Sequence, residues 1–180
     1  MPYTQDGHES VAVAYSDAES TGYISSVLIV QGNVIYAHAR IPPSVRRKLK
    51  PRRTNILAYE LIAAIMTILL LDGLVDERVA VRHFIDNVAA RSIILKGSSK
   101  QIDLNDMAGM VWYSAAHRVK TYYSHWVNSD ANLADKPSRQ DASVMKQLAA
   151  RLVEYNFDAF LLAVESWCLQ PNRAALVARR

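Results

Sequence analysis

The order of strand-like and helix-like segments predicts an α/β fold built on one mixed β-sheet. Three apolar, β-branched segments follow one another early in the chain, separated by short turn sequences, which predicts an antiparallel meander. After the meander, helix-like and strand-like segments alternate, which predicts crossover connections between parallel strands. We therefore expect a five-stranded sheet flanked by helices, with three antiparallel strands followed by parallel ones.

The meander is bounded by residues that favour turns. Gly32 and Asn33 supply a tight turn between the second and third strands. Pro42 and Pro43 end the third strand, because proline cannot donate a ladder hydrogen bond. The three strands are predicted at residues 10–16, 23–30 and 34–41.

The first long helix contains the most apolar run of the chain. Thr54 and Asn55 are both suitable caps for its start, and Gly73 is a suitable stop after residue 71. The apolar run at residues 61–71 is shorter than the roughly 20 residues that cross a bilayer. We therefore expect a helix buried in a protein core and no contact with a membrane.

Two more strands and three more helices complete the pattern. Gly97 ends a short helix, and Asp103 or Asn105 suits the cap of the next one. Ser138 and Asp141 form an S-x-x-D capping box for the last helix. The strands are predicted at residues 79–85 and 119–127, and the helices at residues 87–95, from 103 or 105 to 117, and 138–155.

Length and composition indicate one globular domain with an extension. The 180 residues are 51% hydrophobic and 21% charged, and the net charge of +4 permits nucleic-acid binding without requiring it. The single cysteine, Cys168, excludes an internal disulfide and a cysteine-based zinc cluster. The polar N-terminal segment is unlike a signal peptide. We therefore expect an intracellular protein, cytoplasmic or nuclear, rather than a secreted one. The expected division is a tail at residues 1–9, a domain at 10–155, and a helical extension with a tail at 156–180.

Four carboxylates occupy positions that favour a shared metal site. Asp17 and Asp86 each close an apolar strand-like run, and the crossover connection would make those strand ends neighbours. Glu60 lies inside the apolar helix, and Asp135 lies in the turn before the last helix. Four carboxylates at one point repel each other, and two divalent cations about 3.5–4 Å apart would relieve this repulsion.

Each of these residues also has a structural interpretation without a metal. Asp17, Asp86 and Asp135 could simply occupy turns, which aspartate favours. The Glu60 side chain could extend to the surface. Three further aspartates lie on expected caps or loops, and we expect them to be solvated: Asp103, Asp106 and Asp130.

Four sequence stretches resemble the ribonuclease H domain of retroelement reverse transcriptases. They are YSDAESTGY, LAYELIAAI, FIDNVAARSIILKGSS and HWVNSDANLADKPSR, and the resemblance covers about residues 10–150. The last two stretches match best, through a DN-x-x-A sequence followed by a Lys-Gly turn and through a closing N-x-A-D-x-x-S-R sequence. The resemblance implies a ribonuclease H-like fold and metal-dependent hydrolysis of the RNA strand of an RNA–DNA hybrid.

The resemblance also implies roles for the four carboxylates. Asp17 is expected to bind both ions, Glu60 and Asp86 to bind on the side of the nucleophile or between the ions, and Asp135 to bind one ion more loosely. Oxygen ligands with open water positions suit two Mg²⁺ ions, with Mn²⁺ as a substitute, and no small-molecule cofactor is expected.

Substrate and partner contacts follow from the same resemblance. Polar residues near the start of the Glu60 helix are expected in the minor groove of the hybrid, and residues around the next helix are expected to contact phosphate. The expected nucleic-acid-binding residues are Thr54, Asn55, Asn87, Lys96, Ser98 and Lys100. A basic cluster at residues 46–53 can contact nucleic acid, lie solvated, or contact a reverse transcriptase polymerase domain.

The chain departs from the family pattern in several places. Glu19 stands where Ser or Gly is usual, and it can lie solvated on the turn or crowd the metal site. Only Gly22 remains of a glycine pair that often opens the second strand. The loop at residues 128–133 lacks the histidine of cellular enzymes, and His125 is interpreted as a strand residue. The basic protrusion helix of some cellular enzymes is also absent.

Two other classes of function stay open. One is a catalytically inactive ribonuclease H-like scaffold or nucleic-acid-binding domain, which failure to bind Mg²⁺ would support. The other is a transposase, integrase or resolvase on the same fold, which activity on duplex DNA would support. The position of Glu60 on the first long helix argues against the second class.

Overall fold

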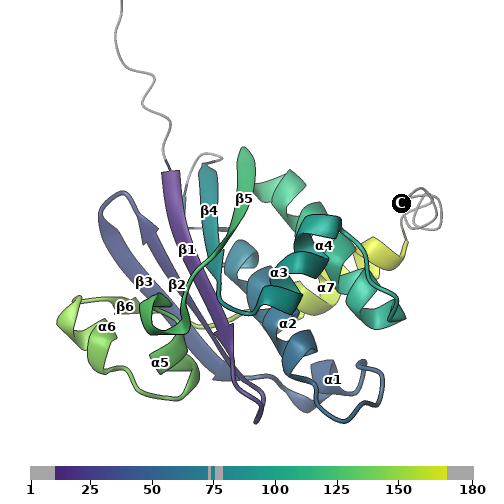
Figure 1. Ribbon diagram of the computed structural model, residues 1–180. Coiled ribbons are helices and arrows are strands. Elements are labelled where there is room, and N and C mark those ends of the chain that lie inside the picture. The colour runs from purple at the N-terminus through teal and green to yellow at the C-terminus, as the bar shows by residue number, and fades with distance from the viewer. Residues whose placement is uncertain (1–10, 73, 76–78, 170–180) are drawn as a thin grey trace, which may run out of the picture.

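The computed structural model describes residues 11–72, 74–75 and 79–169 (Figure 1). Its centre is one six-stranded sheet in the order β5-β4-β1-β2-β3-β6, one strand more than the sequence predicted. The strands are β1 Val11–Ala18, β2 Tyr23–Val30, β3 Asn33–Arg40, β4 Ala80–Ile85, β5 Thr121–Trp126 and β6 Arg151–Leu152.

The first three strands form the expected antiparallel meander. β2 has the predicted bounds, and β1 pairs with it from Val13 opposite Ile29 to Ala18 opposite Ile24. The turn between β2 and β3 was predicted one residue too late. Val30 pairs with Asn33, and the turn residues are Gln31 and Gly32, whose φ angles of 50° and 77° suit a tight hairpin.

The later strands are parallel, as the crossover predicted. β4 lies parallel to β1, with Ser16 opposite Ile85, and β5 lies parallel to β4. The carboxyl ends of β1 and β4 are therefore neighbours, which brings the positions of Asp17 and Asp86 together.

The predicted last helix at residues 138–155 is wrong. The chain instead forms two short helices, α5 Asp135–Ser138 and α6 Ser143–Gln147, and then the short strand β6, which pairs with β3. The left-handed backbone at Gln140, with φ of 66°, prevents α5 from continuing. The expected capping box does not form, because the Asp141 side chain accepts a hydrogen bond from the Ser143 amide at 2.9 Å.

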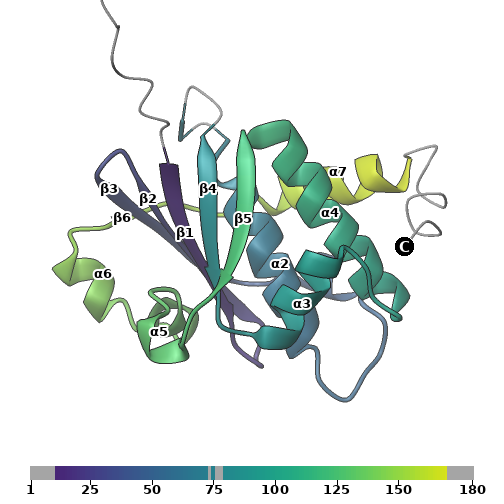
Figure 2. The same cartoon turned by 45° about the horizontal axis from the view of Figure 1, so that its top comes forward.

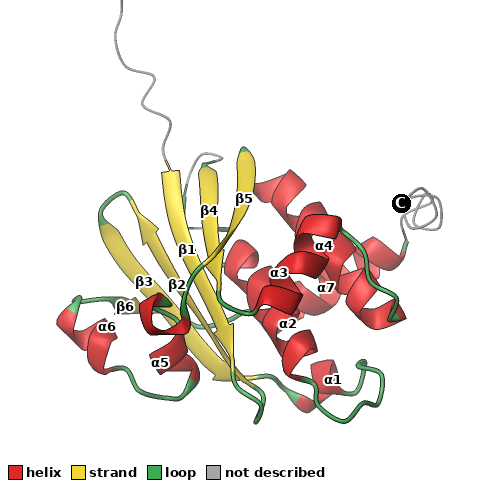
Figure 3. Ribbon diagram, in the orientation of Figure 1, coloured by secondary structure: helices red, strands yellow, loops and turns green. Residues whose placement is uncertain are grey.

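Most helices cover one face of the sheet (Figure 3). Helix α2, Ile56–Leu69, is buried over most of its length, as its apolar sequence predicted. Helix α7, Phe157–Cys168, packs against α4, Ile102–Arg118, where the Trp167 ring contacts Gly109. No helix within the described ranges is long and apolar enough to span a membrane. The helices on this side are α1 Pro43–Arg46, α2 Ile56–Leu69, α3 Val88–Lys96, α4 Ile102–Arg118 and α7 Phe157–Cys168.

The other face is covered only in part (Figure 2). Helices α5 and α6 pack over the β2–β3 side, where Val27 and Tyr36 meet Ala134 and Met145 in a small second core. The segment from β5 to α5, which contains the 3₁₀ turn Ser129–Ala131, reaches the carboxyl end of β1, where the Asn132 amide donates to the Ser16 carbonyl at 3.1 Å. On this second face of the sheet, no described helix covers β4 and β5.

The basic segment at residues 46–53 is tied to the start of α4. The Asp103 carboxylate accepts a charge-assisted hydrogen bond from the Arg52 guanidinium and another from the Lys50 amide at 3.0 Å. The expectation that Asp103 is solvated is wrong, because its side chain is only 10% exposed. Asp103 is not the cap of α4 either, since Gln101 occupies that position.

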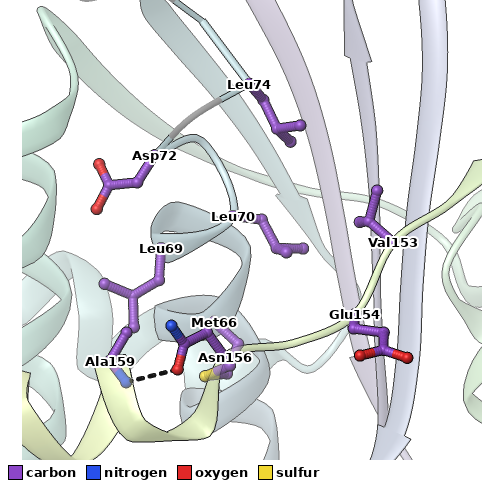
Figure 4. Close-up of a pocket in the computed structure, with 9 residues that line it drawn as sticks. All are labelled: Met66, Leu69, Leu70, Asp72, Leu74, Val153, Glu154, Asn156 and Ala159. Carbon is purple, nitrogen blue, oxygen red and sulfur yellow. Dashed lines mark hydrogen bonds between the residues drawn. The ribbon is translucent and has the colours of Figure 1, made fainter.

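A small apolar cavity of about 270 Å³ lies toward the end of α2 that is remote from Glu60 (Figure 4). Leu69, Leu70 and Leu74 form one side, and Val153 lies opposite. The Asn156 side chain at its rim caps α7 by accepting a hydrogen bond from the Ala159 amide at 3.0 Å. This cavity is separate from the carboxylates discussed below.

Candidate metal centre

Three of the four predicted carboxylates meet at the carboxyl edge of the sheet. Asp17 lies near the end of β1, Asp86 directly follows β4, and Asp135 is the first residue of α5. One oxygen of each lies within 4.8 Å of the others. Glu60, from α2, lies outside this closest group but lines the same cavity of about 430 Å³.

Asp17 is the most buried of the three aspartates, with 5% of its surface exposed. Burial raises the pKa of its carboxyl from 3.8 to about 7, and the charges of Asp86 and Asp135 act in the same direction. A hydrogen bond from the Ser138 hydroxyl opposes the rise. Asp17 is therefore a carboxylate whose charge is poorly compensated by the protein alone.

Glu60 is buried against the same cavity, with 3% of its surface exposed. Its pKa is raised well above the ordinary value, first by burial and then by the charges of Asp17 and Asp86. Hydrogen bonds with the Ala18 backbone and with the Asn87 side chain lower this pKa only in part, and Oε2 has no described hydrogen-bond partner. A divalent cation in this cavity would compensate both buried charges, and carboxylate oxygens are ligands that Mg²⁺ and Mn²⁺ accept.

Asp135 is held by its own helix and by the preceding segment. The Arg139 guanidinium donates twice to Oδ1, at 2.9 and 3.1 Å, which leaves Oδ2 to face other partners. The Asn132 side chain fixes the approach to α5, because its Oδ1 accepts from the Ala134 amide at 3.1 Å while its amide binds Ser16. Ser25 adds a hydrogen bond to the Ala134 carbonyl.

Asp86 is supported by the neighbouring strand and helix. The Trp126 indole donates to the Asp86 carbonyl at 3.1 Å, while about half of the residue's surface stays exposed. Asn87 begins α3 by accepting a hydrogen bond from the Ala90 amide at 3.0 Å. Because Asn87 directly follows Asp86 and is also hydrogen-bonded to Glu60, it links these two acidic residues.

A buried histidine ties the three parallel strands together next to the site. His83 on β4 is hydrogen-bonded to the Ser16 hydroxyl and to the Tyr122 hydroxyl, both at 2.8 Å. Burial lowers its pKa to about 3, so the imidazole stays neutral at physiological pH. This network holds the residue before Asp17 against β4 and β5.

The predicted nucleic-acid-binding residues do not all reach the cavity. Asn87 lines it. Thr54 and Asn55 precede α2, one turn from Glu60, and the next residue, Ile56, lines the cavity. The other three lie farther along, at the end of α3 and in the loop that follows: Lys96, Ser98 and Lys100.

Several residues at the site were not predicted. Ser138 binds Asp17, and Arg139 pairs with Asp135, so the closing Ser-Arg of the matched stretch supplies both partners of the carboxylates. Asn132 in the same stretch positions α5. Glu19, which the sequence left either solvated on the turn or close to the metal site, lines the cavity and accepts a hydrogen bond from the Thr21 hydroxyl at 2.7 Å. The pattern of the stretch contained these residues, but only contacts reveal their roles.

The fold is shared with structures of ribonucleases H. The N-terminal RNase H domain of a Mycobacterium tuberculosis protein superposes with a TM-score of 0.54 at 15% identity, covering 78% of this chain and 99% of that one. RNase H1 from Halobacterium salinarum gives 0.53 at 14% identity, covering 74% and 98%. LC11-RNase H1 in complex with an RNA/DNA hybrid gives 0.54 at 12% identity, covering 76% and 98%.

At these identities the likeness concerns the fold, which is ribonuclease H-like. No protein-family profile matches the chain, and no curated protein matches it in sequence.

Proposed function

We propose that the protein is a metal-dependent endoribonuclease that hydrolyses the RNA strand of RNA–DNA hybrids with two metal ions. The observation that carries the proposal is the meeting of Asp17, Asp86 and Asp135 within 4.8 Å, beside a buried Glu60 with an unpartnered oxygen. Among the described residues no cationic side chain pairs with Glu60, and such a set of oxygen ligands suits divalent metal ions.

The four carboxylates would hold two Mg²⁺ ions, which Mn²⁺ can replace. When bound, the ions would supply activation of the attacking water and stabilisation of the leaving 3′ oxygen. Asp17 is the ligand proposed to be shared, because its charge interacts with those of Asp86, Asp135 and Glu60. Asn87 and Ser138 would orient Glu60 and Asp17 through their hydrogen bonds.

The proposed substrate contacts surround this centre. A hybrid is recognised by its shape, its phosphates and its 2′-hydroxyl groups. Thr54 and Asn55, just before α2, would contact the minor groove, and Asn87, which lines the cavity beside the carboxylates, would contact a phosphate. The α3–α4 loop would contact phosphates farther along, through Lys96, Ser98 and Lys100.

The matched sequence stretches support a more specific origin. We propose that the chain is the ribonuclease H part of a retroelement reverse transcriptase and acts inside the cell beside a polymerase domain. The Ser-Arg ending of the HWVNSDANLADKPSR stretch supports this origin, since both residues contact the acidic cluster.

Cleavage of a labelled RNA–DNA hybrid in Mg²⁺ tests the proposed activity. We expect RNA-strand cleavage by the natural chain and at least a hundredfold loss in Asp86→Asn. Asp130→Asn is the matched control, because Asp130 is an exposed aspartate in the 3₁₀ turn outside the cavity. Duplex DNA and duplex RNA of the same sequence test specificity.

Calorimetric titration with Mg²⁺ and Mn²⁺ separates binding from catalysis. Binding that Asp86→Asn weakens, together with cleavage of the hybrid alone, supports the proposal. A folded chain that binds neither ion would be an inactive scaffold, and preferential cleavage of duplex DNA would indicate a transposase-like or resolvase-like nuclease.

A further inference from the structure

Aromatic side chains form a ladder on the partly open face of the sheet. Tyr15, Phe84 and His125 lie opposite one another on β1, β4 and β5. The Tyr15 and Phe84 rings stack with centroids 5.2 Å apart, and the Phe84 and His125 rings stack with centroids 5.3 Å apart. The ladder ends at His125, which is exposed on the edge strand β5.

A second row lies beside this ladder on the same face. Val13, Arg82 and Tyr123 occupy its three positions, because residues two apart in a strand point to the same side. Arg82 is exposed, and Tyr123 is 54% exposed. The two rows therefore present an aromatic surface with a permanent positive charge, which we call the aromatic platform.

No described helix covers the β4–β5 part of the platform. Helices α5 and α6 pack against Val27 and Tyr36, on β2 and β3, at the other side of the face (Figure 2). Helix α3 contacts β4 and β5 from the opposite, helix-covered side. The exposure of Tyr123, Arg82 and His125 follows from this arrangement.

The charges on the aromatic platform indicate which class of partner it can bind. Within the two rows the only side chain with a permanent charge is Arg82. Among the described residues, the next carboxylates along β1 and β4 on the same face are Asp17 and Asp86, two residues beyond Tyr15 and Phe84 and thus about 7 Å farther along the strands. The platform suits a polyanion that carries flat, unpaired rings.

We propose that the aromatic platform binds single-stranded nucleic acid. A base would extend the stack on the outward side of His125, a second base would stack on Tyr123, and Arg82 would contact the phosphate between them. Exposed aromatic side chains on an open sheet face, accompanied by arginine, bind unpaired bases in this way with little sequence preference. This activity goes beyond the proposed hydrolysis, since it needs neither metal ions nor a paired substrate.

The platform is continuous with the candidate metal centre. Both lie on β1 and β4, and Ser129, from the segment that follows β5, lines the metal cavity. An unpaired strand next to a hybrid could therefore be held while the hybrid occupies the carboxylates.

Fluorescence anisotropy with a labelled oligothymidylate in EDTA tests this inference on the full chain. We expect Tyr123→Ala and His125→Ala each to weaken binding about tenfold. Tyr123→Phe keeps the ring and should keep the affinity, whereas Tyr123→Leu keeps apolar area only and should behave like the alanine variant. Leu162→Ala on α7 is the control for loss of an exposed apolar side chain, because Leu162 is 62% exposed and lies away from the sheet.

The outcomes separate this inference from the proposed function. Unchanged oligothymidylate binding in Tyr123→Ala and His125→Ala overturns the platform, whether or not the chain cleaves hybrids. Equal affinity in Tyr123→Leu and Tyr123→Phe overturns base stacking. If sedimentation shows a dimer that Tyr123→Ala dissociates, with no change in oligothymidylate binding, the face pairs with a second copy and the inference is wrong. Circular dichroism on every variant verifies the fold.

Discussion

At the scale of single residues, the chain holds negative charges that its own side chains leave incompletely compensated. Asp17 receives one hydrogen bond from the Ser138 side chain, and the Glu60 charge is compensated only in part by hydrogen bonds with the Ala18 backbone and the Asn87 side chain. A buried carboxylate without a cationic partner lowers stability, which residues selected only for stability would avoid. The loss of stability caused by the buried Asp17 and Glu60 carboxylates therefore indicates that these residues serve a function.

The pKa of Asp17 predicts how stability without metal depends on pH. Between pH 3.8 and about pH 7, the Asp17 carboxyl of the folded protein holds a proton that the unfolded chain has lost. The free energy of unfolding therefore falls as pH rises through this range. Asp17→Asn removes the titrating group and should raise the free energy of unfolding at pH 8 by about 2 kcal/mol in EDTA. Thermal unfolding at pH 5 and pH 8 measures the effect.

Asp130→Asn serves as the exposed control for this measurement, with an expected change within about 0.5 kcal/mol. Equal destabilisation by Asp17→Asn at both pH values would show that the Asp17 carboxylate is well compensated without metal.

At the scale of elements, the sequence predicted most strands and the long helices but not the region after Asp135. The bounds of β2 and the buried nature of α2 followed from periodicity and apolar content, which depend on neighbours in the chain. The failure at residues 138–155 has a long-range cause. Ser138 bonds to Asp17, 121 residues away, and so is not free to cap a helix.

The candidate site likewise contains some features that depend on neighbours in the sequence and others that depend on long-range contacts. The four acidic positions could be selected from sequence, because each closes a strand-like run, lies in an apolar helix or stands in a matched stretch. Arg139 and Asn132 could not be assigned roles, because their contacts depend on where α5 meets β1. The sixth strand was missed because it has only two residues.

Asn132 should control the placement of α5. Asn132→Ala removes the hydrogen bonds to Ser16 and Ala134 from a buried position, and we expect a loss of about 2 kcal/mol in stability and weaker Mn²⁺ binding. Urea unfolding and calorimetry measure the two effects. Asn128→Ala is the matched control on the exposed side of the same segment, and an equal change in Mn²⁺ affinity there would contradict this role.

The link between the basic segment and α4 depends on one ion pair. Arg52 and Asp103 are largely buried, with side-chain exposures of 14% and 10%. Asp103→Leu alone should cost about 3 kcal/mol, because it leaves the Arg52 guanidinium unpaired, and adding Arg52→Met should restore a large part of the loss. Urea unfolding of both singles and the double variant gives the coupling, and additive losses would show that the pair is effectively solvated.

At the scale of the whole molecule, the sheet separates two kinds of surface. One face carries the helical core, and the other carries α5, α6 and the aromatic platform (Figure 1). The candidate metal centre lies at the edge where both layers meet, since Glu60 comes from the helical side and Asp135 from the other. Changes within one layer should therefore affect the centre less than changes at this edge.

Helix α7 offers a test of that separation. A Cβ atom at Gly109 would approach the Trp167 ring to 2.2 Å, so Gly109→Ala should displace α7 and lower stability by about 2 kcal/mol. Hybrid cleavage at 25 °C should remain within about twofold, because neither residue lies near the carboxylates. Thermal unfolding and Trp167 fluorescence follow the displacement, and Ala116→Ser on the exposed part of α4 is the control. Lost cleavage by a folded Gly109→Ala variant would show that the layers are coupled.

The wide spacing of the acidic residues along the sequence also determines when, during translation, the growing chain can assemble the candidate metal centre. Asp17 emerges first from the ribosome, yet its neighbour Asp86 can join it only after β4 has been made and has paired with β1. Asp135 arrives later still, and Ser138 follows it. A chain that stalls before residue 135 lacks a member of the ligand set, so an incomplete translation product cannot assemble the full centre.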